Sequence, residues 1–179
     1  MTRDDRGNFV NSEGVATESH KIVVKDARQL LPKNRMNLTR NGFELLENTV
    51  PSYDFLDHQE VITRYYRDCE DIVAEATGGK VWAFDHNIRS AGGLAEKRRV
   101  KGGQDVQGPA HIVHGDYTLR SARDRLTQLT EASSVNDTLR QVVPEGQGLI
   151  PKDAANPALN DGGRFAIINV WRNIEAEPV

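Results

Sequence analysis

The sequence predicts a mainly β fold with flanking helices, either a barrel or a sandwich with helices packed outside it. Three observations predict this class. Short β-branched or aromatic segments recur along the chain, one long amphipathic helix occurs in its first half, and several connections are long and polar. Residues 1–20 are polar and lack periodicity, which predicts a flexible N-terminal arm. The length of 179 residues fits a single further domain over residues 21–179.

Five segments have the composition of strands: residues 21–25, 43–46, 80–85, 110–117 and 164–171. A turn centred on Gly42 separates the first two. The last segment is apolar on both faces, which predicts a central strand.

The strongest helical pattern begins at Asp57, a residue type that caps helices, with Glu60 three positions later. Apolar residues then recur at helical spacing until Gly78 and Gly79 end the pattern. Cys69 lies on this apolar stripe, so we interpret it as a small buried hydrophobe rather than a catalytic thiol. Short helices or turns are predicted over residues 121–130 and 136–143, and a polar loop over residues 146–163.

Composition excludes several classes of protein. The 23 Lys and Arg against 26 Asp and Glu give a net charge of −3, which argues against nucleic-acid binding through bulk positive charge. A single cysteine excludes an internal disulfide framework and a Cys-rich zinc module. The charged start and the lack of a long apolar run predict a cytoplasmic protein that does not enter membranes. The basic cluster at residues 97–101 is interpreted as a solvated loop, with a flap over an anionic substrate as the alternative.

The segment around His114 and Asp116 carries the most chemical information. Side chains two apart on a strand project from one face, so both can reach one point, whereas His111 falls on the other face. An imidazole and a carboxylate are two of the three ligands of a facial triad that holds Fe(II). The alternative is a hydrogen-bonded structural pair at a strand end.

Three further residues complete the candidate set. Asn169 and Trp171 share one face of the last predicted strand, and Arg172 projects from the other. An unsatisfied buried amide costs about 1–3 kcal/mol, so Asn169 either bonds neighbouring backbone or faces the His–Asp pair and a co-substrate. Arg172 is a candidate for anion binding, and Thr118 is a candidate for lining the pocket.

Three motifs occur in order: Phe-Asp-His-Asn-Ile-Arg at residues 84–89, His-Gly-Asp-Tyr-Thr at 114–118 and Phe-Ala-Ile-Ile-Asn-Val-Trp-Arg at 165–172. Together they resemble a family of non-haem iron oxygenase-like proteins. That family includes the small cephamycin methoxylation protein and fungal hydroxylase/desaturase enzymes of secondary metabolism. The resemblance runs from about residue 20 to the C-terminus, with Asn173 in place of the family's usual proline.

The resemblance implies a double-stranded β-helix, the jelly-roll barrel of Fe(II)/2-oxoglutarate enzymes. It implies that His114 and Asp116 are iron ligands, with 2-oxoglutarate and dioxygen as co-substrates. Asn169, Arg172 and Thr118 become candidates for binding the co-substrate. The implied activity is that of a dioxygenase, a hydroxylase or desaturase acting on a small secondary-metabolite-like molecule.

Members of the family carry a distal His and a 2-oxoglutarate-binding Arg in a C-terminal continuation. No His follows His114 in this sequence, so we expect the chain to hold the first two thirds of such a domain, with an incomplete barrel. His86 is an alternative third ligand. Together with Asp85 and Arg89 it is otherwise interpreted as a structural knot or as pocket lining.

Three hypotheses follow for the function. The first is an Fe(II)/2-oxoglutarate-dependent oxidoreductase with a small-molecule substrate. The second is a catalytically incomplete binding protein that works with a partner chain or as a homodimer. The third is a metal-free ligand-binding jelly roll in which His114 and Asp116 form a structural pair.

Overall fold

The computed structural model describes residues 2–3, 9–11, 18–29, 36–47, 51–90, 106–109, 113–135 and 137–174. Contacts divide the chain into two compact units. The smaller unit is Ser12–Ser52, and the larger combines Met1–Asn11 with Tyr53–Val179. The predicted arm over residues 1–20 lies mostly outside the described residues and stays a prediction.

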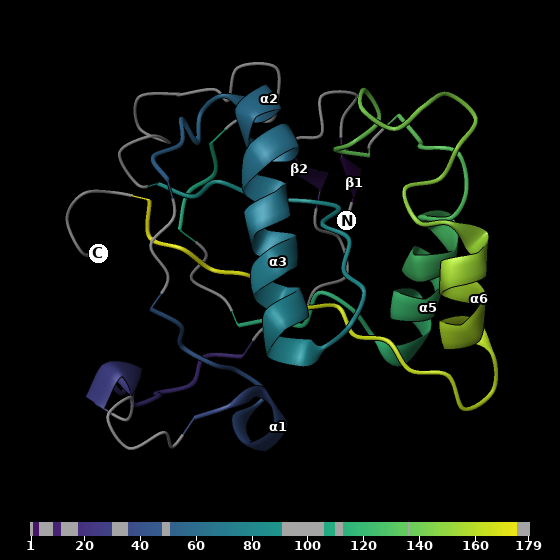
Figure 1. The fold of residues 1–179 in the computed structure, drawn as a ribbon. Coiled ribbons are helices and arrows are strands. Elements are labelled where there is room, and N and C mark those ends of the chain that lie inside the picture. The colour runs from purple at the N-terminus through teal and green to yellow at the C-terminus, as the bar shows by residue number, and fades with distance from the viewer. Residues whose placement is uncertain are drawn as a thin grey trace. The chain divides into compact units, whose positions relative to one another are not determined.

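The described residues are mainly helix and coil, so the predicted mainly β fold and its jelly-roll barrel are wrong (Figure 1). The strands found there are β1 (Thr2–Arg3) and β2 (Phe9–Asn11), which pair antiparallel in a two-stranded ladder. The smaller unit contains the short helix α1 (Leu38–Asn41). The described part of the larger unit contains the α-helices α2 (His58–Glu60), α3 (Tyr66–Thr77), α5 (Leu119–Gln128) and α6 (Lys152–Leu159), with the π-helical turn η2 (Val61–Tyr65) between α2 and α3.

The long helix predicted from Asp57 to Gly78 is confirmed as the continuous run α2, η2 and α3. Asp57 is the N-cap, and its side chain accepts hydrogen bonds from the backbone N–H groups of Gln59 and Glu60. At the other end Gly78 has φ 68°, a left-handed conformation that favours glycine, and its N–H bonds the carbonyl of Ala74. The ends are set by local chemistry, which explains why the sequence predicts them.

The segment 80–85 runs beside this helix without joining a sheet. Ala83 N–H donates to the Glu70 carboxylate over 2.8 Å, so a helix side chain takes the place of a neighbouring strand. Trp82 and Phe84 pack on one core cluster and Ala83 on another. The apolar residues that predicted a strand therefore pack against helices, and shortly after them Arg89 forms an isolated β-bridge with Gln107.

The other predicted strands are also coil where they are described. In the segment 164–171, Phe165 and Ile167 are half-buried, whereas Ile168, Val170 and Trp171 are exposed, so the prediction of a central strand is wrong. Residues 113–117 are coil, and 110–112 lie outside the described residues. Residues 21–25 and 43–46 are mainly exposed and have no ladder partner within the described chain.

Helices α5 and α6 lie side by side (Figure 1). The sequence predicts α5, whereas α6 falls in the predicted polar loop, where Pro157 and its Asn and Gly neighbours indicate a break. The side chain of Arg123 donates to the carbonyl of Leu159, which joins the two helices. The stretch 137–143 forms turns rather than a regular helix.

Two small apolar clusters form the core of the larger unit where the structure describes it. The first joins Val61, Ile62 and Tyr66 of the long helix to Leu139. The second joins Leu129 and Ile150 to Ala155 of α6.

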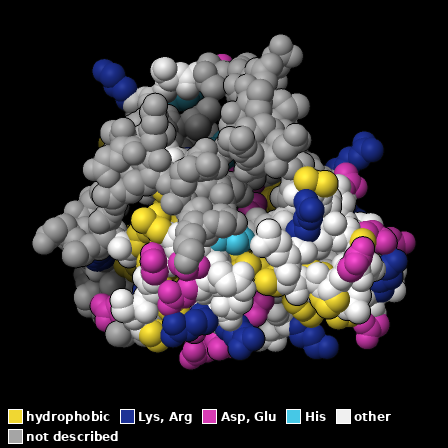
Figure 2. All heavy atoms as spheres, turned by 90° about the horizontal axis from the view of Figure 1, so that it is seen from above, with side chains coloured by type: hydrophobic (Ala, Val, Ile, Leu, Met, Phe, Trp, Pro, Cys, Tyr) yellow, Lys and Arg dark blue, Asp and Glu magenta, His cyan; other side chains and the backbone are white. Residues whose placement is uncertain are grey.

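Acidic and basic side chains intermingle on the face shown in Figure 2, in keeping with the net charge of −3. Within the described ranges, no helix is both long enough and apolar enough to cross a bilayer.

Candidate functional site

The His114–Asp116 pair lies in the coil segment that leads into α5. Thr118 begins this helix as its N-cap: its hydroxyl accepts from Ser121 N–H, and Ser121 Oγ accepts from Thr118 N–H. This reciprocal capping box fixes the chain direction two residues after Asp116. The Thr118 hydroxyl, a predicted co-substrate contact, is therefore used to hold the helix start.

The imidazole and the carboxylate of this pair face each other as the sequence predicts. His114 Nε2 lies 3.4 Å from Asp116 Oδ1, and the two side chains are 43% and 50% exposed. The predicted strand is absent, and the two side chains meet in a coil segment that bends at Asp116. The pair is open enough to admit a ligand and close enough to act on one atom.

Asn169 joins this pair from the distant segment 164–172. Its Nδ2 donates to Asp116 Oδ2 over 3.0 Å, across 53 residues of sequence. Of the two alternatives for Asn169, the structure therefore shows contact with the His–Asp pair. The bond holds one carboxylate oxygen, which leaves Oδ1 directed toward His114.

The geometry of the pair fits two neighbouring ligands of one metal ion. Nitrogen and oxygen ligands lie about 2.1 Å from a transition metal. Two such atoms 3.4 Å apart would subtend about 108° at an ion about 2.1 Å from each, close to the tetrahedral value. Partners that orient a ligand are a regular part of metal sites, and Asn169 has that position here. Within the described residues, no group of three or more His, Cys, Asp or Glu side chains could hold a metal ion.

Arg172 turns away from the pair toward the long helix. Its Nε donates to the Tyr65 hydroxyl over 3.2 Å, and its guanidinium lies 5.9 Å from the centre of the Tyr65 ring. Burial raises the pKa of Tyr65 to about 12, so the hydroxyl stays protonated at neutral pH. Arg172 therefore ties the segment 164–172 to η2, which supports the placement of Asn169.

A second polar cluster, which sequence reasoning missed, lies under the long helix. The Tyr66 hydroxyl and His86 Nδ1 are 2.8 Å apart, and the His58 and His86 rings are tilted by 31° with centroids 5.4 Å apart. Burial, with the neighbouring His58, lowers the pKa of His86 to about 4. His58 Nδ1 is buried and has no hydrogen-bond partner among the residues that the structure describes. The available signal was the spacing of His58 and Tyr66, eight residues apart on one helix face.

The remaining predicted residues are engaged in structural contacts away from the His114–Asp116 pair. Asp85 Oδ1 accepts from the Thr138 hydroxyl over 2.5 Å, and Arg89 donates to the Gly108 carbonyl over 3.1 Å. His86 bonds Tyr66, so it is committed to the second cluster. Cys69 is half-buried, and burial raises the pKa of its thiol, which agrees with a packing role.

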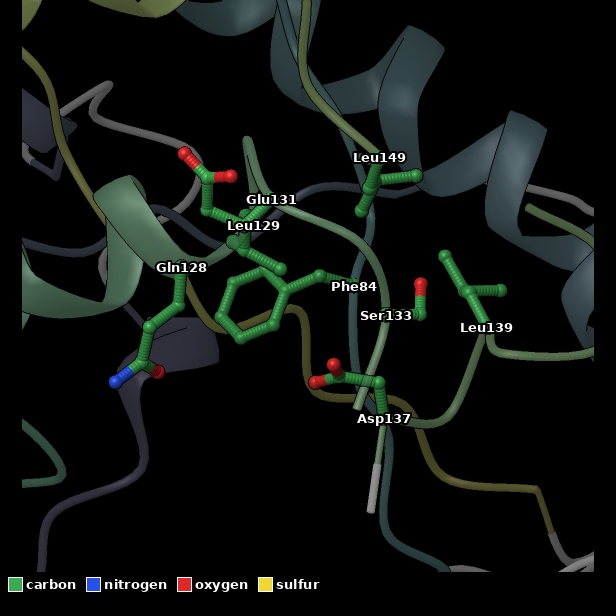
Figure 3. Close-up of a pocket in the computed structure, with 8 residues that line it drawn as sticks. All are labelled: Phe84, Gln128, Leu129, Glu131, Ser133, Asp137, Leu139 and Leu149. Carbon is green, nitrogen blue, oxygen red and sulfur yellow. The ribbon is translucent and has the colours of Figure 1, made fainter. Parts of the chain in front are cut away.

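A hollow near the end of α5 is lined by none of the residues of the His114–Asp116 pair or of the Tyr66, His86 and His58 cluster (Figure 3). Its two carboxylates already have partners: Asp137 pairs with Arg125 over 2.9 Å, and Glu131 pairs with Lys152 over 2.9 Å. Burial alone would raise the pKa of Asp137, but hydrogen bonds from Ser134 and Arg125 lower it. The hollow has eight lining residues, Phe84, Gln128, Leu129, Glu131, Ser133, Asp137, Leu139 and Leu149. None of them is a predicted site residue.

Comparison with known families places the chain. The profile of the oxidoreductase/YMDC permease-like domain matches residues 2–144. The chain belongs to this family. The part that matches the oxidoreductase/YMDC permease-like domain includes His114 and Asp116, whereas Asn169 lies beyond it. No solved structure matches the chain.

Two relatives extend this comparison. An uncharacterized protein from the dcmA 3′ region of Methylophilus leisingeri is 40% identical over 176 residues, which cover 97% of this chain and 80% of that protein. A protein of Emericella nidulans named as an oxidoreductase is 32% identical over 156 residues, which cover 86% of this chain. The match spans 44% of the length of the Emericella protein.

Proposed function

We propose that this oxidoreductase-like domain belongs to an Fe(II)/2-oxoglutarate-dependent enzyme that hydroxylates or desaturates a small molecule. The observation that carries the proposal is the convergence of His114, Asp116 and Asn169. An imidazole and a carboxylate are ligands that suit Fe(II). A side chain that donates a hydrogen bond to the carboxylate, as Asn169 does, is typical of the residues that orient such ligands. The oxidoreductase named in Emericella supports the same class of reaction.

In this proposal His114 and Asp116 hold the iron. When bound, iron would let dioxygen oxidise 2-oxoglutarate together with a C–H bond of the substrate, chemistry that the side chains cannot supply. Asn169 would keep the Asp116 carboxylate in one orientation as it binds. Arg172 would act from a distance, because its bond to Tyr65 holds the segment that carries Asn169.

Two ligands leave several coordination positions open, which suits an enzyme that must also bind a co-substrate. A third protein ligand is not among the described residues. This observation favours a second candidate: the chain supplies part of a site that another polypeptide segment or a partner chain completes. By this account the chain binds iron weakly alone and turns over only with that partner.

The experiment is the release of labelled CO2 from 1-[14C]2-oxoglutarate by the purified chain with Fe(II) and ascorbate. We expect slow iron-dependent release that His114→Ala abolishes. His20→Ala is the matched control, because His20 also lies beside a carboxylate, at 3.2 Å from Glu18. Release that is equal in the wild type and in His114→Ala would contradict the proposal. No release from a wild type that still binds iron would favour the second candidate.

A further inference from the structure

The smaller unit, Ser12–Ser52, has little core of its own. Met36 is the one buried residue among those that the structure describes in this unit. Large apolar side chains of the unit are exposed instead, namely Ile22, Val23, Val24, Phe43 and Leu46. The first three are consecutive, and their exposed fractions are 68%, 84% and 85%. Single exposed apolar residues are ordinary, but a contiguous run marks a surface that another chain covers.

The backbone of this apolar run is also unpaired. Residues 20–26 are coil, and the backbone groups of residues 20–25 have no hydrogen bond to other described backbone. Six residues are an ordinary length for a β-strand, and Ile22, Val23 and Val24 have the β-branched side chains that strands favour. An unpaired segment of this composition is a template on which a strand from another chain can add.

The charges beside the apolar run make the segment complementary to itself. Lys21 precedes the run, and Lys25 and Asp26 follow it. In one antiparallel arrangement of two copies, Val23 of each copy lies opposite Val24 of the other. Lys21 then lies opposite Asp26, and the two-fold symmetry repeats every contact. A shift by one residue sets Lys21 against Lys25, and a parallel in-register pair sets each lysine against its own copy. Opposite charges across two strands stabilise a pair and like charges destabilise it, so the first arrangement is favoured.

Both partners of this charge pair are accessible. Lys21 is exposed, and the side chain of Asp26 is 46% exposed. Asp26 Oδ1 accepts from the backbone N–H of Arg28 over 3.0 Å and from its guanidinium over 3.4 Å. Both of these bonds use the same oxygen, so Oδ2 can accept from the ammonium group of a second copy.

We propose that residues 20–26 are the contact between two copies of this chain, paired as an antiparallel ribbon with two Lys21–Asp26 ion pairs. The apolar run of each copy contacts that of the other, and the backbone groups of both gain partners. A ribbon of two short strands is smaller than a permanent interface, so the dimer is weak and depends on concentration. The inference is independent of the proposed function, because it uses neither His114 nor Asp116.

The test is sedimentation velocity of the full chain over a range of concentrations. We expect the wild type to change from monomer to dimer as the concentration rises. Lys21→Asp and Asp26→Lys each set two pairs of like charges across the ribbon, so each should weaken the dimer at least about tenfold. Glu44→Lys is the matched control, because Glu44 is exposed in the same unit but lies outside the segment.

A mixture of the two variants guards against misfolding. When Lys21→Asp and Asp26→Lys are mixed in equal amounts, each position 21 again meets an opposite charge at position 26. Mixed dimers should therefore form with close to the wild-type affinity, a rescue that variants without their fold could not give. A wild type that stays monomeric at every concentration would overturn the inference and leave an unlike partner as the occupant. Dimerisation that neither variant weakens, or that the mixture fails to restore, would overturn it too.

Discussion

Two His–carboxylate pairs with the same spacing lie in very different surroundings. His20 Nε2 is 3.2 Å from Glu18, and His114 Nε2 is 3.4 Å from Asp116. The first pair is 71% and 85% exposed, whereas the second is 43% and 50% exposed and receives a hydrogen bond from Asn169. Spacing alone therefore brings an imidazole to a carboxylate. What distinguishes a candidate site is support from a distant part of the chain.

The largest expected effect extends this comparison to His86, a histidine that is largely buried. The pKa of His86 is lowered from 6.5 to about 4, chiefly by burial, so protonation favours the unfolded chain. Above pH 6.5 His86 is neutral in both states and does not reduce stability. As the pH falls from 6.5 to 4, its protonation in the unfolded chain lowers the free energy of unfolding by about 3 kcal/mol. Urea unfolding of the wild type and His86→Gln across this range measures it. His20→Gln should follow the wild type, and an unchanged pH slope in His86→Gln would contradict the account.

Metal-dependent stability separates the two pairs directly. At a Mn²⁺ concentration one hundred times its dissociation constant, a bound ion adds about 2.7 kcal/mol to the free energy of unfolding. Asp116→Ala should lose this increment, whereas Glu18→Ala should keep it. Chemical unfolding with and without Mn²⁺ makes the comparison. Equal increments in the two variants would show that the Asp116 pair has no special role.

Removing the support tests why the two pairs differ. Asn169→Ala leaves both ligands in place but frees the Asp116 carboxylate, which in other metal sites costs 10–100-fold in affinity. We expect a tenfold loss of Mn²⁺ affinity, which is about 1.4 kcal/mol, measured by calorimetric titration. Asn169→Asp is the informative companion, because it keeps the size of the side chain and places a second carboxylate beside Asp116. Unchanged affinity in Asn169→Ala would mean that the hydrogen bond is incidental.

The smallest effect concerns the helix that follows the pair. Thr118→Ala removes the N-cap of α5 and should lower the free energy of unfolding by about 1 kcal/mol. Metal affinity should change little, because the Thr118 hydroxyl bonds Ser121. Thr118→Ser should restore the stability. A large loss of metal affinity with unchanged stability would return Thr118 to the predicted role of a co-substrate contact.

The long helix could be predicted because its determinants are local. Asp57 and Gly78 form the two ends through contacts with residues two to four positions away. A strand needs a hydrogen-bonding partner that can lie anywhere in the chain, so local sequence does not identify it. In the segment 80–85 the backbone N–H of Ala83 donates to the carboxylate of Glu70 on the long helix instead of to a neighbouring strand. The apolar residues of 80–85, whose strand propensity predicted a sheet, are instead buried against helices. The predicted barrel therefore does not form.

The candidate site was predicted in part for the same reason. His114 and Asp116 are two positions apart in the sequence, so their contact follows from spacing. The hydrogen bond from Asn169 to Asp116 spans 53 residues, and the sequence predicts it only as one of two alternatives. The cluster of Tyr66, His86 and His58 depends on the packing of 80–86 against the helix. That packing has no local signature, so the spacing of His58 and Tyr66 on one helix face does not by itself indicate His86 as their partner.

The most direct test of the central claim is the visible absorption spectrum of the chain titrated with Co²⁺, a spectroscopic substitute for Fe(II). The account predicts saturation at one ion per chain, with the spectrum lost in His114→Ala and retained in His20→Ala. Saturation that is unchanged in His114→Ala, or that is lost equally in both variants, would contradict the assignment of His114 and Asp116 as metal ligands.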